Sequence, residues 1–338
     1  DRTPFYAEGG GQLADGGRIV LSNGAVIEIE DVQAPVTGLS VHRGRIISGE
    51  VSVGDNGLAT IDQERRDGIS RAHTATHMVH KAFREILGET ATQAGSENSP
   101  GRFRFDFPST GAVSEGVLND VESRVNTLLL DNLEVSAEVM SQDEAKKLGA
   151  MALFGEKYGD RVRVVSVGDW ARELCGGTHV ARSGQLGVVK LLSESSIGAG
   201  VRRVEALVGV DAYKFLAREH ILLNSLTSLI KGSRAEELPE RISDLLSKFK
   251  EIEKELAQVR SAAAMADISK FAAGAKKIDG ATVTSVRIPD GISVDDLRKI
   301  AIDLRASSPK SVVALISSND GKPVLVVAAS DGAREVGV

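Results

Sequence analysis

Short segments of alternating apolar and polar residues dominate the first 66 positions. The stretch "RIVLSNGAVIEIEDVQ" contains two such segments around Asn23-Gly24, a dipeptide typical of tight hairpins. The pattern continues through "LSVHRGRIISGEVSVGDNGLATID", where "HRG" and "DNG" mark further turns. Strands this short at this spacing predict a small β-barrel over residues 1–66.

Helical and alternating segments are mixed over residues 67–210. The stretch "SRAHTATHMVHKAFREILG" has apolar residues at helical spacing, with Ser70 as the expected N-cap and Gly88 as the expected end. "SEGVLNDVESRVNTLLLDNL" predicts a second amphipathic helix, and "FRFDF", "RVRVVSVG" and "LGVVKLLSESS" predict strands. We therefore expect an α+β core in this part of the chain.

Residues 211–275 are almost wholly helical in pattern. One helix is expected over 211–230 and is ended by "KGS". In the next, apolar residues follow each other in steps of four and three, which is a three-heptad seam. The seam residues are Leu238, Ile242, Leu245, Phe249, Ile252, Leu256 and Val259. Two such helices predict an antiparallel hairpin, or coiled-coil arm, whose simplest role is structural.

The last part, residues 276–338, returns to a mixed pattern. "ATVTSVRI", "VVALISS" and "PVLVVAAS" predict strands, and "NDG" is expected to join the last two as a hairpin. A helix beginning after Ser293 lies between the first two strands. This predicts a partial globular α/β module.

Composition narrows the class of protein. Hydrophobic residues make up 42% and charged residues 26% of 338 residues, which is typical of a globular protein with several domains. No apolar run approaches the roughly 18 residues of a membrane span. The net charge of −6 argues against binding nucleic acid over the whole surface, but a local basic face would suffice. The chain begins with Asp1 in mid-pattern, so we interpret it as a fragment whose upstream part is missing.

The single cysteine changes this picture. Cys175 cannot form an internal disulfide, which fits a reducing, cytoplasmic location and leaves catalysis or metal binding as roles for the thiol. Four positions on stands His179, and the helix 70–88 carries two histidines one turn apart. Together they form a good zinc shell of three nitrogens and one sulfur. The candidate ligands are His73, His77, Cys175 and His179. Gly176 and Gly177 are expected to let the loop turn tightly.

Alternatives to a catalytic zinc remain open at this point. The thiol could be an inert buried group, or the helix histidines a surface pair. Four protein ligands would also suit a purely structural zinc. Zinc-protease chemistry is disfavoured, because Thr74 stands where those enzymes carry a glutamate. His80 is a candidate contact for a metal ligand, whereas His42 and His220 are expected at the surface.

Five motifs in this order resemble the alanyl-tRNA synthetase family. They are "DRTPFYAEGGGQ", "RAHTATH", "ALFGEKYGD", "CGGTH" and "GAGVRRVEA". The two histidine motifs also occur in related editing domains, including free-standing alanyl-tRNA deacylases and the threonyl-tRNA synthetase editing domain. The resemblance implies zinc-dependent hydrolysis of tRNA(Ala) wrongly charged with serine or glycine. The family's aminoacylation domain, which binds ATP and alanine, is expected to be absent.

The resemblance also implies roles for individual residues. It assigns the zinc ligands named above, a hydroxyl near the aminoacyl group at Thr76, and a polar residue of the editing pocket at Gln93. A glycine motif linked to recognition of serine's hydroxyl corresponds to Gly9, Gly10, Gly11 and Gln12. The family often has serine at the first of these positions, where this chain has Gly9. Arg202 and Arg203 are expected to meet the end of the tRNA.

Three functions are compatible with these features. The first is the editing half of an alanyl-tRNA synthetase, with zinc either polarising a water or orienting the substrate. The second is a free-standing deacylase, and the third is a non-catalytic tRNA-binding or dimerising module with structural zinc. Cys175 as a covalent nucleophile is disfavoured, because a zinc-bound thiolate is a poor one. The expected partners are tRNA(Ala) and, through the arm and C-terminal module, a second copy of the chain.

Overall fold

The computed structural model describes residues 2–36, 38–151, 159–230, 234–319 and 321–335. Within these ranges the chain is α+β and divides into two compact units, Asp1–Leu222 and Leu223–Val338. The boundary falls inside the helix α4 (Val210–Leu229). No helix in the described part of the chain is long and apolar enough to cross a membrane. The predicted division into four domains stays a prediction.

The first unit begins with an open four-stranded sheet in the order β3-β2-β1-β4, where a closed barrel was expected. Its strands are β1 (Gly17–Leu21), β2 (Val26–Val36), β3 (Leu39–Ser48) and β4 (Gly57–Ile61). The hairpin predicted at Asn23-Gly24 is confirmed between β1 and β2. The barrel prediction is corrected because the edge strands β3 and β4 do not pair. β3 is exposed at nearly every position, including the apolar residues Leu39, Val41 and Ile46, so it forms an open edge of the sheet.

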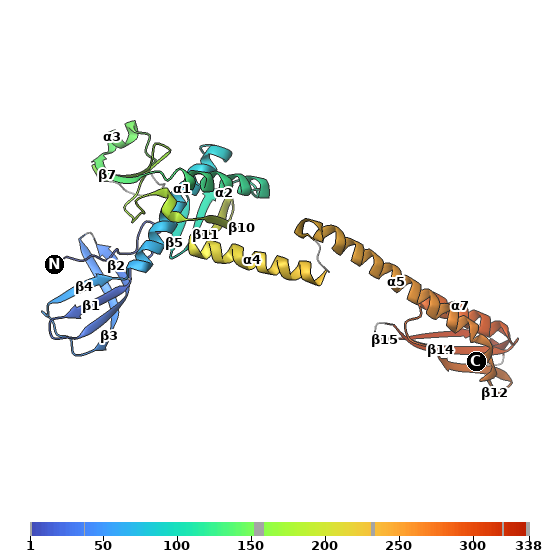
Figure 1. The fold of residues 1–338 in the computed structure, drawn as a ribbon. Helices are drawn as coiled ribbons and strands as arrows, with labels where there is room; N and C mark the ends of the chain where they lie inside the picture. Colours follow the sequence, from blue (N-terminus) through green and yellow to red (C-terminus); the bar gives the residue numbers. More distant parts are fainter. Residues whose placement is uncertain (1, 37, 152–158, 231–233, 320, 336–338) are drawn as a thin grey trace. The chain divides into compact units, whose positions relative to one another are not determined.

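Helix α1 (Gln63–Leu87) is the centre of the first unit (Figure 1). It packs against a sheet in the order β10-β11-β6-β5 and against helix α2 (Glu115–Leu130). The strands of this sheet are β5 (Gly95–Ser99), β6 (Arg102–Pro108), β10 (Val189–Gly198) and β11 (Val201–Val208). Their inner faces contribute phenylalanines and valines to the main core of the unit.

The start of α1 differs from the prediction, while its end agrees. Asp62, not Ser70, is the N-cap and accepts a hydrogen bond from the backbone N–H of Arg65 at 3.0 Å. The added first turns are polar, and contacts with the N-terminal segment hold them. Arg65 donates to the carbonyl oxygen of Ala14, and Arg66 pairs with buried Asp15. The helix ends at Gly88 as expected, where φ is +100°.

A three-stranded sheet completes the first unit and leads into the cysteine loop. It has the order β7-β8-β9 and contacts the short helix α3 (Gln142–Lys147). Its strands are β7 (Val135–Ser141), β8 (Arg161–Val167) and β9 (Ala171–Leu174). After this loop, the 3-10 turn Ser183–Leu186 packs on α1 and α2. Most of the motif "ALFGEKYGD", residues 152–158, lies outside the described residues.

The second unit contains the long helix and a small α/β module. Helix α5 (Leu238–Ala266) follows the 3-10 turn Ala235–Glu237 and leads into α6 (Ile268–Ala273). The module's sheet has the order β12-β13-β14-β15, with α7 crossing between the parallel strands β13 and β14. Its elements are β12 (Lys276–Ile278), β13 (Ala281–Arg287), α7 (Val294–Ala306), β14 (Ser311–Asn319), β15 (Lys322–Ala329) and α8 (Asp331–Arg334). Ser293 is the N-cap of α7, and β14 and β15 form a hairpin, both as predicted. The hairpin packing of α4 against α5 stays a prediction, and the expected break at 231–233 lies outside the described residues.

Candidate metal centre

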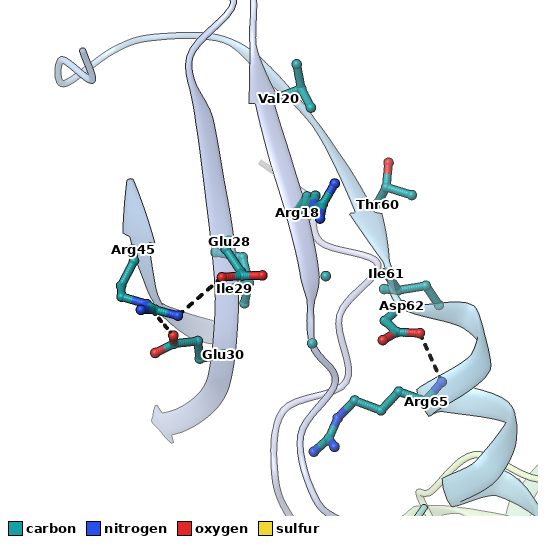
Figure 2. A pocket seen from close by; sticks show the side chains of 12 residues that line it. Arg18, Val20, Glu28, Ile29, Glu30, Arg45, Thr60, Ile61, Asp62 and Arg65 are labelled. Carbon is teal, nitrogen blue, oxygen red and sulfur yellow. Dashed lines mark hydrogen bonds and ion pairs between the residues drawn. The ribbon is translucent and has the colours of Figure 1, made fainter. Parts of the chain in front are cut away.

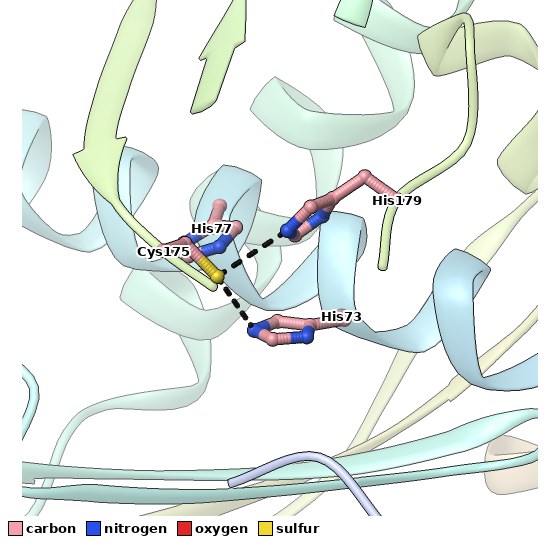
Figure 3. Close-up of side chains that lie close together, drawn as sticks. All are labelled: His73, His77, Cys175 and His179. Carbon is pink, nitrogen blue, oxygen red and sulfur yellow. Dashed lines mark hydrogen bonds between the residues drawn. The ribbon is translucent and has the colours of Figure 1, made fainter. Parts of the chain in front are cut away.

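Two segments about 100 residues apart meet at one buried cluster (Figure 3). Helix α1 presents His73 and His77 from successive turns of one face, and the loop after β9 presents Cys175 and His179. The thiol sulfur lies 3.3 Å from Nε2 of His73 and 3.3 Å from Nε2 of His179. The predicted set of four candidate ligands is therefore brought together.

The geometry of the cluster fits a metal ion such as zinc. One ligand atom from each of the four residues lies within 4.8 Å of all the others. Tetrahedral zinc with ordinary Zn–S and Zn–N bonds keeps neighbouring ligand atoms about 3.3–3.6 Å apart. Nε2 of His77 is buried and has no hydrogen-bond partner among the described residues. A buried nitrogen of this kind needs a partner, and an ion at the centre of the cluster would provide one.

Each imidazole contacts a different polar side chain through its Nδ1 atom. Nδ1 of His73 lies 2.8 Å from Oε1 of Gln12, and Nδ1 of His179 lies 3.1 Å from Oγ1 of Thr74. Nδ1 of His77 forms a short hydrogen bond with Oε2 of Glu173. Contacts of this kind set the tautomer and the orientation of metal-binding histidines. They leave Nε2 of His73 and of His179 facing the sulfur of Cys175, and Nε2 of His77 without a hydrogen-bond partner among the described residues.

Charge inside the cluster favours an ionised thiol. Burial would raise the pKa of Cys175, but the surrounding imidazoles, His77 foremost, outweigh it and lower the pKa to about 2. Burial would lower the pKa of His77, but Glu173 and the thiolate outweigh it and raise the pKa to about 10. For His179, burial is the largest effect and lowers the pKa to about 3. The cluster therefore offers a thiolate and neutral or deprotonatable imidazoles, which are the zinc-binding forms.

Glu173 is a residue of this site that the sequence analysis missed. It is 2% exposed, and burial, which would raise its pKa, is outweighed by His77 and His80, so that its pKa is lowered. Its other oxygen, Oε1, lies 2.8 Å from Nδ1 of buried His80, which places His80 beside a partner of a candidate metal ligand. One signal in the sequence could have identified it. Glu173 stands two positions before Cys175 at the end of a strand, where alternate residues share a face.

The two loop glycines differ in whether their surroundings leave room for a side chain. Neither Gly176 nor Gly177 has a positive φ, so the expected tight turn does not explain them. A Cβ atom at Gly177 would lie 2.2 Å from Cε1 of His73, whereas one at Gly176 would meet nothing within 4 Å. Gly177 is thus required by the close approach of the loop to the ring of His73.

The hydroxyl of Thr76 bonds to β5 and to its own helix, not to one of the four candidate ligands. It is 1% exposed and lies 2.6 Å from Oδ1 of Asn98 in β5, to which it donates. The backbone N–H of Asn98 in turn donates to the carbonyl oxygen of Gly11 at 2.6 Å. Asn98, which the sequence analysis did not single out, thus connects Thr76 to the glycine motif.

The glycine motif forms a tight turn beside β5. Gly9 and Gln12 pair as an isolated bridge, and Gly10 and Gly11 have φ values of +58° and +76°. A Cβ atom at Gly11 would lie 2.2 Å from Oγ of Ser96, and the same Oγ accepts a hydrogen bond from Nε2 of Gln93 at 3.1 Å. The structure therefore brings Gln93 close to the glycine motif.

Arg202 and Arg203 lie on opposite faces of their sheet. Arg203 alternates with buried Val204, so it faces away from the core beneath α1, and it forms a bidentate pair with Asp106 at 2.7 and 2.8 Å. Arg202 is on the other face and pairs with Glu194. Both guanidinium groups already have carboxylate partners within the chain.

A separate hollow lies on the N-terminal sheet (Figure 2). Its charges are of both signs, and Arg45 pairs there with Glu28 and Glu30 at 3.3 and 2.6 Å. None of the predicted site residues lines it. The hollow is therefore distinct from the candidate metal centre.

Two family models match parts of the chain. Residues 162–205 match the model described as the threonyl and alanyl tRNA synthetase second additional domain, and they include the cysteine loop. Residues 1–65 match the model of class II (A) tRNA synthetases.

Similarity to individual proteins extends over the whole chain. The alanine–tRNA ligase of a Nocardioides species is 62% identical over 341 aligned positions. Those of Acidothermus cellulolyticus and Streptomyces avermitilis are 55% and 54% identical. In each case all of this chain is covered, and it spans 38% of the relative's length.

Proposed function

We propose, from the premise that this chain belongs to the alanyl-tRNA synthetase family, that it performs editing: hydrolysis of the ester bond in tRNA(Ala) charged with serine or glycine. The observation that carries this proposal is the convergence of His73, His77, Cys175 and His179 on one buried point. A zinc ion held there supplies Lewis acidity to ester hydrolysis. The parent activity of the relatives, alanine–tRNA ligation, is a proposal for the longer protein and not for this chain alone.

The surroundings of the cluster suit an aminoacyl ester. The turn over residues 9–12, Thr76 and Asn98 are linked to one another by hydrogen bonds, and Gln12 joins this network to His73. A hydrogen-bonding group beside the cluster that meets serine's hydroxyl would favour serine over alanine, because alanine would leave that group without a partner. A Cβ atom at Gly9 would meet only the carbonyl oxygen of Ala7, at 3.9 Å. The glycine found there thus leaves open space where the family often has serine.

A structural zinc without catalysis is the second candidate. The observation that favours it is the completeness of the set, since four protein ligands close a tetrahedral shell. In that case the chain would bind tRNA(Ala) and leave its ester intact. A free-standing deacylase would share the site and the chemistry, and it would differ only in lacking the synthetase's other domains.

The deciding experiment is hydrolysis of Ser-tRNA(Ala) by the zinc-loaded chain. We expect turnover with the native sequence and loss of turnover with Cys175→Ala. The affinity for zinc should fall roughly 10²–10³-fold, if about 10–16 kcal/mol of binding free energy is shared evenly among four ligands. His42→Ala is the matched control, because His42 lies in β3 and contacts Thr3, outside the cluster. Binding of tRNA(Ala) without turnover of Ser-tRNA(Ala) would reject the editing proposal in favour of the structural one.

A further inference from the structure

The side-chain amide of Gln12 is fully buried and forms hydrogen bonds with residues at the metal cluster. Its side chain is 0% exposed, and Oε1 lies 2.8 Å from Nδ1 of His73 and 2.8 Å from the backbone nitrogen of Thr178. Nε2 donates to Oγ1 of Thr178 at 2.9 Å. Thr178 immediately precedes His179 in the loop, so one side chain contacts both segments that carry metal ligands.

The hydrogen bonds settle the orientation of this amide. A backbone nitrogen is always a donor, so the atom that faces the nitrogen of Thr178 must be the amide oxygen. The same oxygen can only accept, and therefore Nδ1 of His73 must carry the proton. In a neutral ring Nε2 is then bare, and its lone pair points towards the sulfur of Cys175 at 3.3 Å.

We propose that Gln12 is a positioning residue of the metal centre, and that it fixes His73 in the tautomer that binds zinc through Nε2. The resemblance to known synthetases implied another role, recognition of a substrate hydroxyl. Both lone pairs of Oε1 are already used by His73 and Thr178, which leaves no acceptor on this side chain for a substrate. The inference rests on the metal-binding part of the proposed function and not on the hydrolysis itself.

Glycines in the surrounding backbone allow the amide of Gln12 to reach His73. Gly10 and Gly11, which have positive φ, turn the chain so that Gln12 enters the core beside β5. Gly177 completes the contact, because a Cβ atom there would lie 2.7 Å from Oε1 of Gln12 and 2.4 Å from Nδ1 of His73. The glycines on both sides of the contact are thus explained by the approach of three segments to one imidazole.

The test compares two substitutions at Gln12 and one control. Gln12→Met keeps the length of the side chain but removes its polar atoms, so the dissociation constant for zinc should rise about 10–100-fold. Gln12→Glu keeps an acceptor for both N–H groups, and the hydroxyl of Thr178 can reverse to donate, so the affinity should stay close to that of the native chain. Gln33→Met is the matched control, because Gln33 bonds to Glu8 and Asp31 on the N-terminal sheet. Affinities come from competition with a chromophoric chelator, and the thiolate-to-cobalt absorption band of Co²⁺-loaded chains reports the ligand set.

The outcomes separate clearly. Native affinity in Gln12→Met, or equal weakening in Gln12→Met and Gln12→Glu, would overturn the proposal. A second measurement needs no variant: ¹⁵N-resolved NMR of the zinc-loaded native chain should show the proton of His73 on Nδ1, and a proton on Nε2 would overturn the proposal as well. Because every readout is zinc binding, failure to hydrolyse Ser-tRNA(Ala) would refute editing and leave this inference standing.

Discussion

The two longest helices of the chain, α1 and α5, differ in what their side chains contact. α1 has 25 residues and buries 14 of them, including His73, His77 and His80. α5 has 29 residues and a regular heptad seam, yet only Leu238 and Ala264 are buried. The more regular apolar pattern thus belongs to the helix with the less buried surface. Apolar periodicity predicts that a helix forms, but the partner that covers its apolar face lies elsewhere in the chain or in another molecule.

The largest expected effect is a difference in stability between alanine variants of two phenylalanines, one on each helix. Phe83 in α1 is 0% exposed and packs on Phe107 with ring centroids 4.8 Å apart, whereas Phe249 in the seam of α5 is 59% exposed. Phe83→Ala should lower the free energy of unfolding by about 3–5 kcal/mol. Phe249→Ala should change it by less than about 0.5 kcal/mol. Urea unfolding measures both, with fluorescence of Trp170 reporting the first unit and circular dichroism reporting the helices of both units.

Protein concentration adds a control to this experiment. If Phe249→Ala costs as much as Phe83→Ala, and the cost grows with concentration, a second copy covers the seam. That result would break the contrast between the helices and support the predicted homodimer through the arm. A large cost that does not depend on concentration would instead support the predicted hairpin of α4 with α5.

The next effect concerns Glu173, which links α1 to the strand that carries the cysteine loop. Glu173→Gln removes the charge that pairs with His77 and His80 while keeping the size of the side chain. At a pH where His77 is already deprotonated, the dissociation constant for zinc should rise about 10–100-fold, because His77 loses the carboxylate that orients it. Competition titration measures this constant. Glu194→Gln is the control, since Glu194 pairs with Arg202 away from the ligands, and equal weakening in both variants would contradict the role of Glu173.

Zinc binding should also depend on pH in a defined direction. Without metal, His77 has a pKa raised to about 10 and is protonated near neutrality, whereas Cys175, with its pKa lowered to about 2, is already ionised. Zinc must displace the proton of His77, so affinity should rise as the pH is raised from neutrality, by up to about tenfold per pH unit. Calorimetry in buffers of different ionisation enthalpy should show about one proton released per zinc ion at neutral pH. Release of two protons would mean that the thiol is not ionised in the free site.

The comparison also explains which features could be predicted from the sequence. His73 and His77, like Cys175 and His179, are placed by spacing within a single turn or loop, so their pattern is visible locally. Their Nδ1 partners are 61, 96 and 105 residues away and are of three chemical types, and no period marks them. The start of α1 was missed for a similar reason, because its polar first turns depend on contacts with Ala14 and Asp15. Closure of the N-terminal sheet depended on pairing of its edge strands, which alternation within each strand does not specify.

The smallest expected effects are on selectivity and zinc affinity, and they come from substitutions of two threonines on opposite faces of α1. Thr74 touches His179 and Thr76 touches Asn98, so the two hydroxyls contact different groups. Thr76→Val should lower the preference for serine over alanine in deacylation, by less than about tenfold for one lost hydrogen bond, and should leave zinc affinity unchanged. Thr74→Val should do the reverse and weaken zinc binding by a similar factor, because His179 loses the group behind its Nδ1. Deacylation of Ser-tRNA(Ala) and Ala-tRNA(Ala) is measured beside zinc titration for both variants. If the two substitutions give the same profile, the division of α1 into a metal-binding face and a substrate-facing side is wrong, and the helix acts as a single support for the cluster.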